Sequence, residues 1–333
     1  MDATPADGGT WSEVSGTTGD VVQARDVSGG IHFHRLASEV PRPRQLPSPQ
    51  PVFVDREEAF AGLDGVVSAG AGRIAVVVGM PGVGKTALAV QWSNRNRDRF
   101  PDGQLYLNLH GYGEGPPVGP LRALWAFLVA LGVPRSELAV DVEEAAAQYR
   151  SALAGRRVLI VLDNAREAQQ ARPLLPGHGA CAVLVTSRAH MSGLVAREGA
   201  RRIVLGVLPE NDAVTLLARL VQSDRPDDQP SALGQFARLC ARLPLALRIA
   251  AEHALSRPRT RLEDLVEDLR GQAALWRALT VEEGDQAEDL AAAQSVFAWS
   301  YRALPAEAAR VFRLLAMHPG PDFGETAATA LAG

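Results

Sequence analysis

The amino-acid sequence predicts an α/β fold in which a parallel sheet is covered by helices and is followed by an all-α region. Short, continuously apolar segments alternate with helical patterns between residues 52 and 205, which is typical of a parallel sheet buried on both faces. A glycine-rich turn at residues 79–86 separates the first of these segments from a helix. After Pro209 the pattern becomes wholly helical, which indicates a second domain.

The expected strands are short apolar runs bounded by turn-forming or charged residues. They cover residues 73–79, 104–109, 157–162, 181–186 and 202–205. The expected helices carry apolar residues at spacings of three and four. Between the strands they cover residues 85–96, 121–131, 143–153 and 165–172. In the later region they cover residues 210–221, 233–242, 245–254, 262–270, 288–303 and 305–317.

The first 51 residues differ in composition from the rest of the chain. Residues 21–34 have the pattern of strand, glycine-containing turn and strand, which predicts a hairpin. His32 and His34 fall on one face of its second strand. Alternation explains them as the solvent-exposed face, and a metal site is the alternative. Five prolines between residues 41 and 51 predict an extended linker.

Composition limits the classes of function that the chain can have. Its 333 residues are enough for two or three domains, and the 47% hydrophobic and 22% charged residues are ordinary for a globular protein. The net charge of −4 argues against direct binding of nucleic acid. No apolar run is long enough to span a bilayer, and the N-terminus lacks the pattern of a signal sequence. The two isolated cysteines suit a reducing compartment, so we expect a cytoplasmic protein. Without a long apolar run or a net positive charge, we do not expect it to bind membranes.

The turn at residues 79–86 has the sequence Gly-Met-Pro-Gly-Val-Gly-Lys-Thr, which fits the phosphate-binding P-loop pattern in full. Its glycines allow backbone N–H groups to surround phosphate oxygens at the start of a helix. Lys85, the chain's only lysine, is expected to reach the β- and γ-phosphates, and the Thr86 hydroxyl to bind Mg²⁺. A simple glycine-rich turn is the alternative. The motif predicts a P-loop NTPase sheet that binds a purine nucleoside triphosphate or diphosphate with Mg²⁺.

Two further strands end in residues suited to the same site. Asp163 follows the apolar run 157–162 and is expected to lie on the Mg²⁺ side, whereas a helix cap is its alternative role. Asn164 follows it and, as a neutral amide, cannot accept a proton from an attacking water. Arg188 ends the sequence Thr-Ser-Arg after the strand at 181–186. It could distinguish triphosphate from diphosphate, or it could be an ordinary solvated arginine.

These motifs together resemble the NB-ARC group of STAND signal-transduction ATPases, from about residue 52 to residue 333. Phe-Val-Asp-Arg-Glu at 53–57 is similar to the family's entry motif, in which a valine and an arginine surround the adenine; here Asp55 replaces a glycine. Leu-Asp-Asn at 162–164 and Thr-Ser-Arg at 186–188 are similar to its Walker B and phosphate-sensing segments. Arg-Leu-Pro-Leu-Ala at 242–246 is similar to its Gly-Leu-Pro-Leu-Ala motif, whose proline packs on the adenine.

The resemblance implies a P-loop nucleotide-binding domain at 52–205, a helical domain at 206–283 and a partial winged-helix domain at 284–333. Met317-His318-Pro319 lies too early in that last domain, and lacks the aspartate, to be the family's sensor. The residues expected to act on phosphate are Lys85, Asp163 and Arg188, with Thr86 and Asp163 on the metal. The residues expected to contact the nucleotide are Val54, Arg56, Gly79, Pro81, Gly82, Val83, Gly84, Lys85, Thr86, Ala87, Arg188 and Pro244.

The resemblance implies a nucleotide-dependent switch that hydrolyses ATP slowly. Exchange of diphosphate for triphosphate would open the contact between the sheet domain and the helical domain, and would permit self-assembly or binding of protein partners. One alternative is a turnover ATPase, such as a motor or remodelling enzyme, although Asn164 stands where such enzymes often have an acid. The other is a nucleotide-regulated transcription factor, which the acidic charge of this chain disfavours.

Overall fold

The structure is a computed structural model that describes residues 41–54, 56–68, 73–112, 116–177, 179–221, 230–279 and 306–315. The chain divides into two units, Met1–Glu39 and Val40–Gly333, and the described residues belong to the second. The expected hairpin with His32 and His34, Asp55, the helix expected at 288–303 and most of the expected winged-helix region lie outside the described residues. None of the described helices is long and apolar enough to cross a bilayer.

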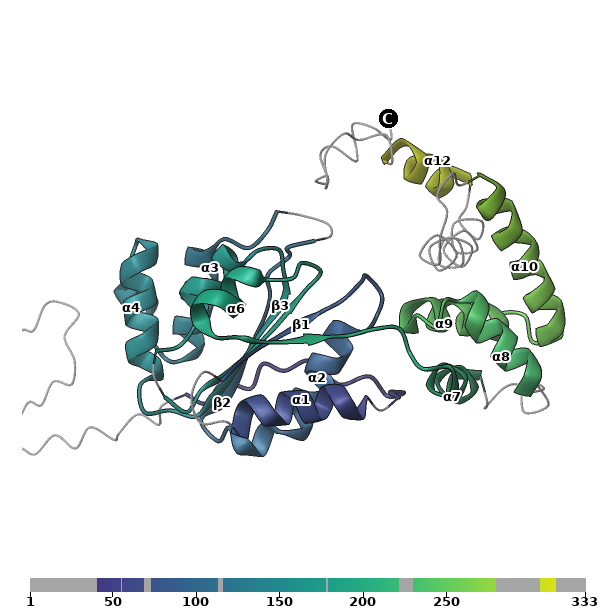
Figure 1. The fold of residues 1–333 in the computed structure, drawn as a ribbon. Helices are drawn as coiled ribbons and strands as arrows, with labels where there is room; N and C mark the ends of the chain where they lie inside the picture. The colour runs from purple at the N-terminus through teal and green to yellow at the C-terminus, as the bar shows by residue number, and fades with distance from the viewer. Residues whose placement is uncertain are drawn as a thin grey trace, which may run out of the picture. The chain divides into compact units, whose positions relative to one another are not determined.

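Five parallel strands form one sheet in the order β2-β3-β4-β1-β5 (Figure 1). The strands are β1 (Ile74–Val78), β2 (Gly103–Asn108), β3 (Val158–Ala165), β4 (Ala182–Ser187) and β5 (Arg201–Val204). Because β1 lies between β4 and β5, the loop that follows it emerges near the ends of β3 and β4. The predicted α/β fold with a parallel sheet is confirmed.

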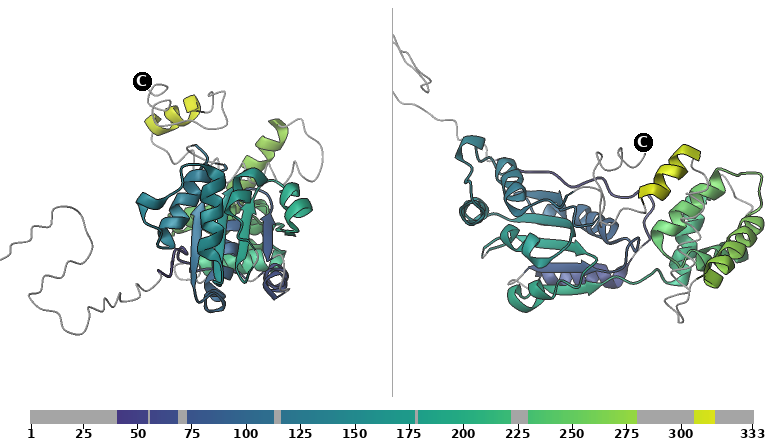
Figure 2. Two further views of the ribbon diagram at one scale, coloured as in Figure 1. Left: turned by 90° about the vertical axis from the view of Figure 1, so that its left-hand side faces the viewer. Right: turned by 90° about the horizontal axis from the view of Figure 1, so that it is seen from above.

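Helices cover both faces of the sheet, as the continuous apolar runs predicted (Figures 1 and 2). Alternate residues of β1 separate the two cores: Ala75 and Val77 belong to the cluster with α1 and α2, and Val76 and Val78 to the cluster with α3, α4 and α6. The helices are α1 (Glu57–Ser68), α2 (Lys85–Arg95), α3 (Pro120–Ala130), α4 (Val142–Leu153), α5 (Ala168–Ala171) and α6 (Ser192–Glu198). Three 3₁₀ turns lie at Arg97–Arg99, Arg135–Glu137 and Arg172–Leu174.

The later region is helical, as expected. It consists of α7 (Glu210–Val221), α8 (Pro230–Leu239), α9 (Pro244–Leu255) and α10 (Leu262–Leu279), and α12 (Ala306–Leu315) is described further along the chain. Phe236, Leu247 and Leu265 form the centre of its core. This core is continuous with the one between α1, α2 and the sheet, so the helical region packs directly on the P-loop domain.

Two helices were not expected, and one begins later than expected. Gly62 and Gly65 interrupt the helical pattern of α1. Gly62 is suited to its position because a Cβ there would lie 3.3 Å from the Ile203 side chain. Helix α6 is too short to show clear periodicity. The helix expected from residue 165 is wrong at its start, because β3 continues through Ala165 with a register shift after Leu162.

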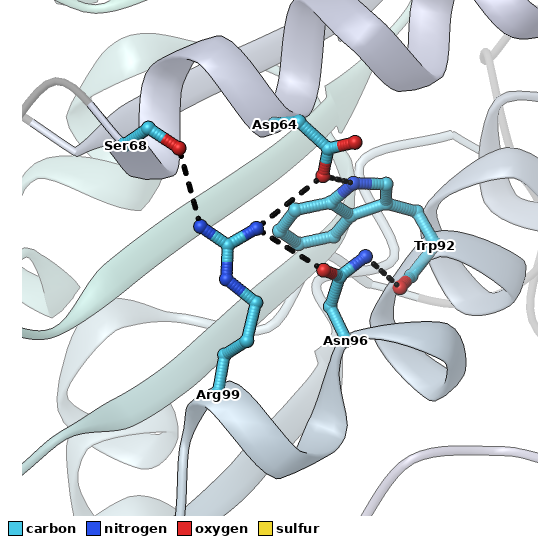
Figure 3. Close-up of polar contacts among 5 residues, drawn as sticks. All are labelled: Asp64, Ser68, Trp92, Asn96 and Arg99. Carbon is cyan, nitrogen blue, oxygen red and sulfur yellow. Dashed lines mark hydrogen bonds and ion pairs between the residues drawn. The ribbon is translucent and has the colours of Figure 1, made fainter.

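A cluster of polar side chains fastens α1 to α2 (Figure 3). The indole Nε1 of Trp92 donates to Asp64 Oδ1 at 3.0 Å, and Arg99 Nη1 approaches the same oxygen at 3.5 Å. Arg99 also donates to Asn96 Oδ1 and to Ser68 Oγ. These bonds hold the helix that begins with Lys85 at a fixed distance from α1.

The proline-rich segment after residue 40 is extended, as expected, and it lies along the edge strand β2. Gln45 N donates to Gln104 O at 3.0 Å, and Gln104 N donates to Pro43 O at 2.7 Å. Gly103 permits this approach, since a Cβ there would lie 2.6 Å from Pro43 Cδ. The segment therefore covers backbone groups that an edge strand would otherwise expose.

Candidate functional site

A cavity of about 590 Å³ opens at the carboxyl ends of β1, β3 and β4. Its volume lies within the range of about 300–1,000 Å³ that is usual for small-molecule sites. Residues from the P-loop, the strand ends, the proline-rich segment and α9 line it. They are Pro47, Ser48, Gln50, Pro81, Gly82, Gly84, Lys85, Thr86, Ala87, Val90, Tyr106, Asn108, Asp163, Asn164, Thr186, Arg188, Pro244, Leu245 and Arg248.

The loop between β1 and α2 has the conformation that its glycines predict. Gly82 and Gly84 have positive φ angles of 77° and 97°, which residues with a Cβ rarely adopt. Gly84 is also the N-cap of α2 and offers no capping side chain to the first amides of the helix. These amides are a site for an anion, and the helix dipole adds to their attraction.

The amino group of Lys85 is turned toward this loop. Its Nζ donates to Gly79 O at 2.8 Å and to Met80 O at 2.9 Å. Burial, and then the nearby charge of Arg188, lower the pKa of Lys85 to about 8, while Asp163 acts in the opposite direction. A bound anion would favour the protonated form, so binding and protonation at this position are coupled.

The order of the strands, the loop after β1 and the position of Lys85 together identify the fold of the sheet domain. The sheet domain is a P-loop NTPase fold. Its phosphate-binding loop follows the strand between β4 and β5, and its acidic strand end lies on β3, with β4 between them.

Asp163 is the centre of a network of hydroxyl groups at the P-loop. Its side chain is only 3% exposed. Oδ1 accepts hydrogen bonds from Thr86 Oγ1 at 2.8 Å and from Thr186 Oγ1 at 2.5 Å, and Oδ2 accepts one from Tyr106 OH at 3.0 Å. Burial and the charge of Asp163 raise the pKa of Tyr106, so its hydroxyl remains a donor at neutral pH. The expected proximity of Thr86 and Asp163 is observed.

This pair suits Mg²⁺, because a carboxylate and a hydroxyl are hard oxygen ligands and Mg²⁺ is commonly bound by one or two carboxylates together with phosphates. No group of three or more His, Cys, Asp or Glu side chains with metal-binding geometry occurs among the described residues. One carboxylate and one hydroxyl are a donor set that leaves further positions of such an ion to other oxygen ligands.

Asn164 sits on the bulge of β3 with φ 56°. Its backbone N donates to Thr186 Oγ1 at 2.8 Å, and its side-chain Nδ2 donates to Tyr112 O at 2.6 Å. The backbone of Gly111 in turn donates to Asn164 O. The side-chain amide is thus engaged in holding the loop after β2. Glu167, which could have replaced it as a base, is exposed and does not line the cavity.

Arg188 follows β4, lines the cavity and is exposed. Its guanidinium carbon lies 4.8 Å from the centre of the Tyr112 ring, within the distance of a cation–π contact. Arg188, which is expected to sense the terminal phosphate, thus lines the same cavity as Lys85 and contacts an aromatic ring.

Helix α9 closes the opposite side of the cavity. Leu245 N donates to Gly82 O at 3.2 Å, and a Cβ on Gly82 would lie 3.2 Å from Leu245 Cβ. Pro244, at the first turn of α9, lines the cavity, and a Cβ on Gly84 would lie 3.7 Å from its Cγ; its contact with a base stays a prediction. Arg248, one turn later, also lines it and donates to Val52 O.

Four of the expected nucleotide contacts do not line the cavity: Val54, Arg56, Gly79 and Val83. Arg56 supports the site from behind, because its guanidinium donates to Val83 O at 3.0 Å and to Gly206 O at 2.6 Å. Burial lowers its pKa. Direct contact between Val54 or Arg56 and a base stays a prediction.

Sequence reasoning missed several lining residues, among them Tyr106, Arg248, Pro47, Ser48 and Gln50. The position of Arg248 could have been predicted, because it lies four residues after Pro244 and so on the same face of α9. Tyr106 had none, because only strand pairing brings β2 next to β3.

Comparison with known proteins gives two relatives. The regulatory protein AfsR of Streptomyces coelicolor is 39% identical over 298 residues, which are 87% of this chain and 29% of that protein. AfsR of Streptomyces griseus is 39% identical over 293 residues, with the same coverage. This chain thus spans less than a third of the length of these relatives. No protein-family model matches it.

The solved structures to which this chain is similar include the following two. A STAND protein with a tetratricopeptide repeat sensor from Pyrococcus horikoshii has a TM-score of 0.49 and 16% identity, over 87% of this chain and 40% of that one. A Walker-type ATPase of Pyrococcus abyssi has a TM-score of 0.47 and 13% identity, over 83% of this chain and 82% of that one.

Proposed function

We propose that this chain is the nucleotide-dependent switch of a regulatory protein, and that it binds ADP or ATP with Mg²⁺ between the P-loop domain and the helical domain. The hydrogen bond from Leu245 N to Gly82 O carries the proposal, because it joins the helical domain to the phosphate-binding loop itself. The two AfsR relatives, which are named regulatory proteins, support the assignment to regulation.

In this proposal the P-loop amides and Lys85 bind the phosphates, and Thr86 with Asp163 holds Mg²⁺. When bound, the ion neutralises phosphate charge. Arg188 contacts the terminal phosphate of a triphosphate. Pro244 and Arg248 form the helical side of the site. A ligand shifts a conformational equilibrium only by its different affinity for the two states, so the contact between Gly82 and α9 is where nucleotide identity would act.

We further propose that hydrolysis is slow. Among the described residues that line the cavity, Asp163 is the sole acid, and hydroxyl groups engage both of its oxygens. Asn164 bonds to a carbonyl and cannot act as a base. This supports a switch over a turnover ATPase. The same proposal includes three domains, at 52–205, 206–283 and 284–333. It also includes a cytoplasmic location, binding of protein partners or self-assembly, and no direct contact with nucleic acid or membrane.

The nucleotide that co-purifies with the chain tests the proposal most directly. Denatured protein should release ADP or ATP, and after its removal calorimetry should show binding of ADP. Lys85→Ala should abolish most of that binding. A chain that binds neither ADP nor ATP would overturn the proposal, whereas rapid steady-state hydrolysis would favour a turnover ATPase.

A further inference from the structure

Three hydroxyl groups from three separate elements converge on the carboxylate of Asp163. Thr86 belongs to α2 and Thr186 to β4, and both donate to Oδ1. Tyr106 belongs to β2, and its hydroxyl donates to Oδ2 at 3.0 Å. The Tyr106 hydroxyl therefore fixes the rotation of the carboxylate about its Cβ–Cγ bond, which the two threonines on a single oxygen leave less defined.

Tyr106 is itself held in place from two sides. Its strand pairs with β3, with Tyr106 opposite Val161 and Asn108 opposite Asp163. On the other side, Tyr106 N donates to Gln45 Oε1 at 3.3 Å, next to the backbone bonds that fasten the proline-rich segment to β2. The ring packs against the core shared with α2, and the residue borders the cavity. Strand pairing and the bond to Gln45 thus hold Tyr106 in the position from which its hydroxyl reaches Asp163.

We propose that Tyr106 is a positioning residue for Asp163 and sets the contribution of Mg²⁺ to nucleotide affinity. Groups that orient a metal-binding side chain typically affect metal affinity about 10–100-fold when they are removed. The inference rests on the proposed Mg²⁺–nucleotide site and adds a residue that acts through Asp163.

Calorimetric titration of ADP, in excess Mg²⁺ and in EDTA, tests this role in the nucleotide-free chain. Tyr106→Phe keeps the ring and removes only the hydroxyl. We expect it to reduce the affinity gain due to Mg²⁺ by about tenfold, at the low end of that range, and to leave affinity in EDTA unchanged. Tyr149→Phe is the matched control, because it removes a fully buried hydroxyl that has no hydrogen-bond partner and lies in the other core. It should change neither titration.

A double-mutant cycle with Asp163→Asn separates positioning from other roles. If Tyr106 acts through Asp163, then adding Tyr106→Phe to Asp163→Asn should reduce the gain in ADP affinity due to Mg²⁺ only slightly further. An unchanged Mg²⁺ gain in Tyr106→Phe overturns the inference while the proposed site stands. An equal loss in EDTA overturns it too, since Tyr106 would then act on the nucleotide or on the fold. An unmodified chain that binds ADP without any Mg²⁺ gain refutes the metal site itself.

Discussion

The guanidinium of Arg188 lies over the ring of Tyr112, with 4.8 Å between the guanidinium carbon and the ring centre. Tyr112 is in turn held by the bond that Asn164 Nδ2 donates to its carbonyl. The Asn164 side chain on the bulge of β3 therefore holds the backbone of Tyr112, whose ring contacts the charge of Arg188. In the proposed site, a terminal phosphate would compete with this contact for Arg188, and such a contact is worth about 0.5–1 kcal/mol at exposed sites.

We expect Arg188→Ala to weaken binding of a non-hydrolysable ATP analogue by about 10–100-fold and binding of ADP much less, because only the triphosphate presents the oxygens that it would pair with. Tyr112→Leu should have a small effect in the opposite direction on the analogue, since it frees Arg188. Calorimetry with both nucleotides measures this. Equal losses for both nucleotides in Arg188→Ala would make Arg188 an ordinary surface cation.

Lys85→Ala should reduce ADP affinity by about 10–100-fold, the value of a hydrogen bond to a charged group. Lys85→Arg should recover only part of it, because the planar guanidinium is wider than an ammonium and the space beside Gly79 O and Met80 O is small. Arg97→Lys, at an exposed position of the 3₁₀ turn that follows α2, is a control for the reverse exchange of the same two residue types. Full affinity in Lys85→Arg would contradict the geometric argument.

ADP affinity should fall as the pH rises above about 8. Because its pKa is lowered, the Lys85 amino group of the empty site loses its charge near that pH, and the bound phosphate favours the protonated form. Binding above pH 8 should therefore take up about one proton, which calorimetry in buffers of different ionisation enthalpy detects. Lys85→Ala should lose this dependence. Proton uptake that persists in the variant would assign the effect to another group.

ADP with Mg²⁺ should stabilise the contact between the P-loop and α9. At a hundredfold excess over Kd the gain in unfolding free energy is about 2.7 kcal/mol, so the melting temperature should rise. Leu245→Pro removes the N–H that donates to Gly82 O at a helix position where proline is tolerated. It should reduce the protection from hydrogen exchange that ADP gives to residues 206–255, and Leu245→Ala is its control. Unchanged exchange with ADP in the unmodified chain would refute the bridging model.

Single-turnover hydrolysis should be slower than about 1 s⁻¹, the low end of the usual range for enzymes. Asn164→Asp introduces a base, which typically contributes about 10²–10⁴-fold, so the rate should rise. The same change should lower the unfolding free energy by about 1–3 kcal/mol, because the bond to Tyr112 O is lost and a carboxylate faces a carbonyl. Thermal unfolding shows whether the variant is folded under the assay conditions. A faster rate in the unmodified chain would favour the turnover ATPase.

The sequence by itself determined the parallel α/β architecture, the phosphate-binding loop and the acid at the end of β3. These features are encoded locally: apolar periodicity reports burial on one or two faces, and the spacing of Gly82, Gly84 and Lys85 specifies a loop within a few residues. The predicted start of α5 was wrong because it depended on a contact between distant strands, which local sequence does not encode. Nothing near Ala165 signals that pairing with Ser187 extends the strand.

Only the tertiary structure decided which residues complete the site. Tyr106 meets Asp163 because β2 pairs with β3 across more than fifty residues of chain. The proline-rich segment reaches the cavity because it binds along β2, and Leu245 reaches Gly82 because α9 packs on the loop. Such contacts depend on strand order and on the fit of distant surfaces, and no periodicity within a single segment carries that information.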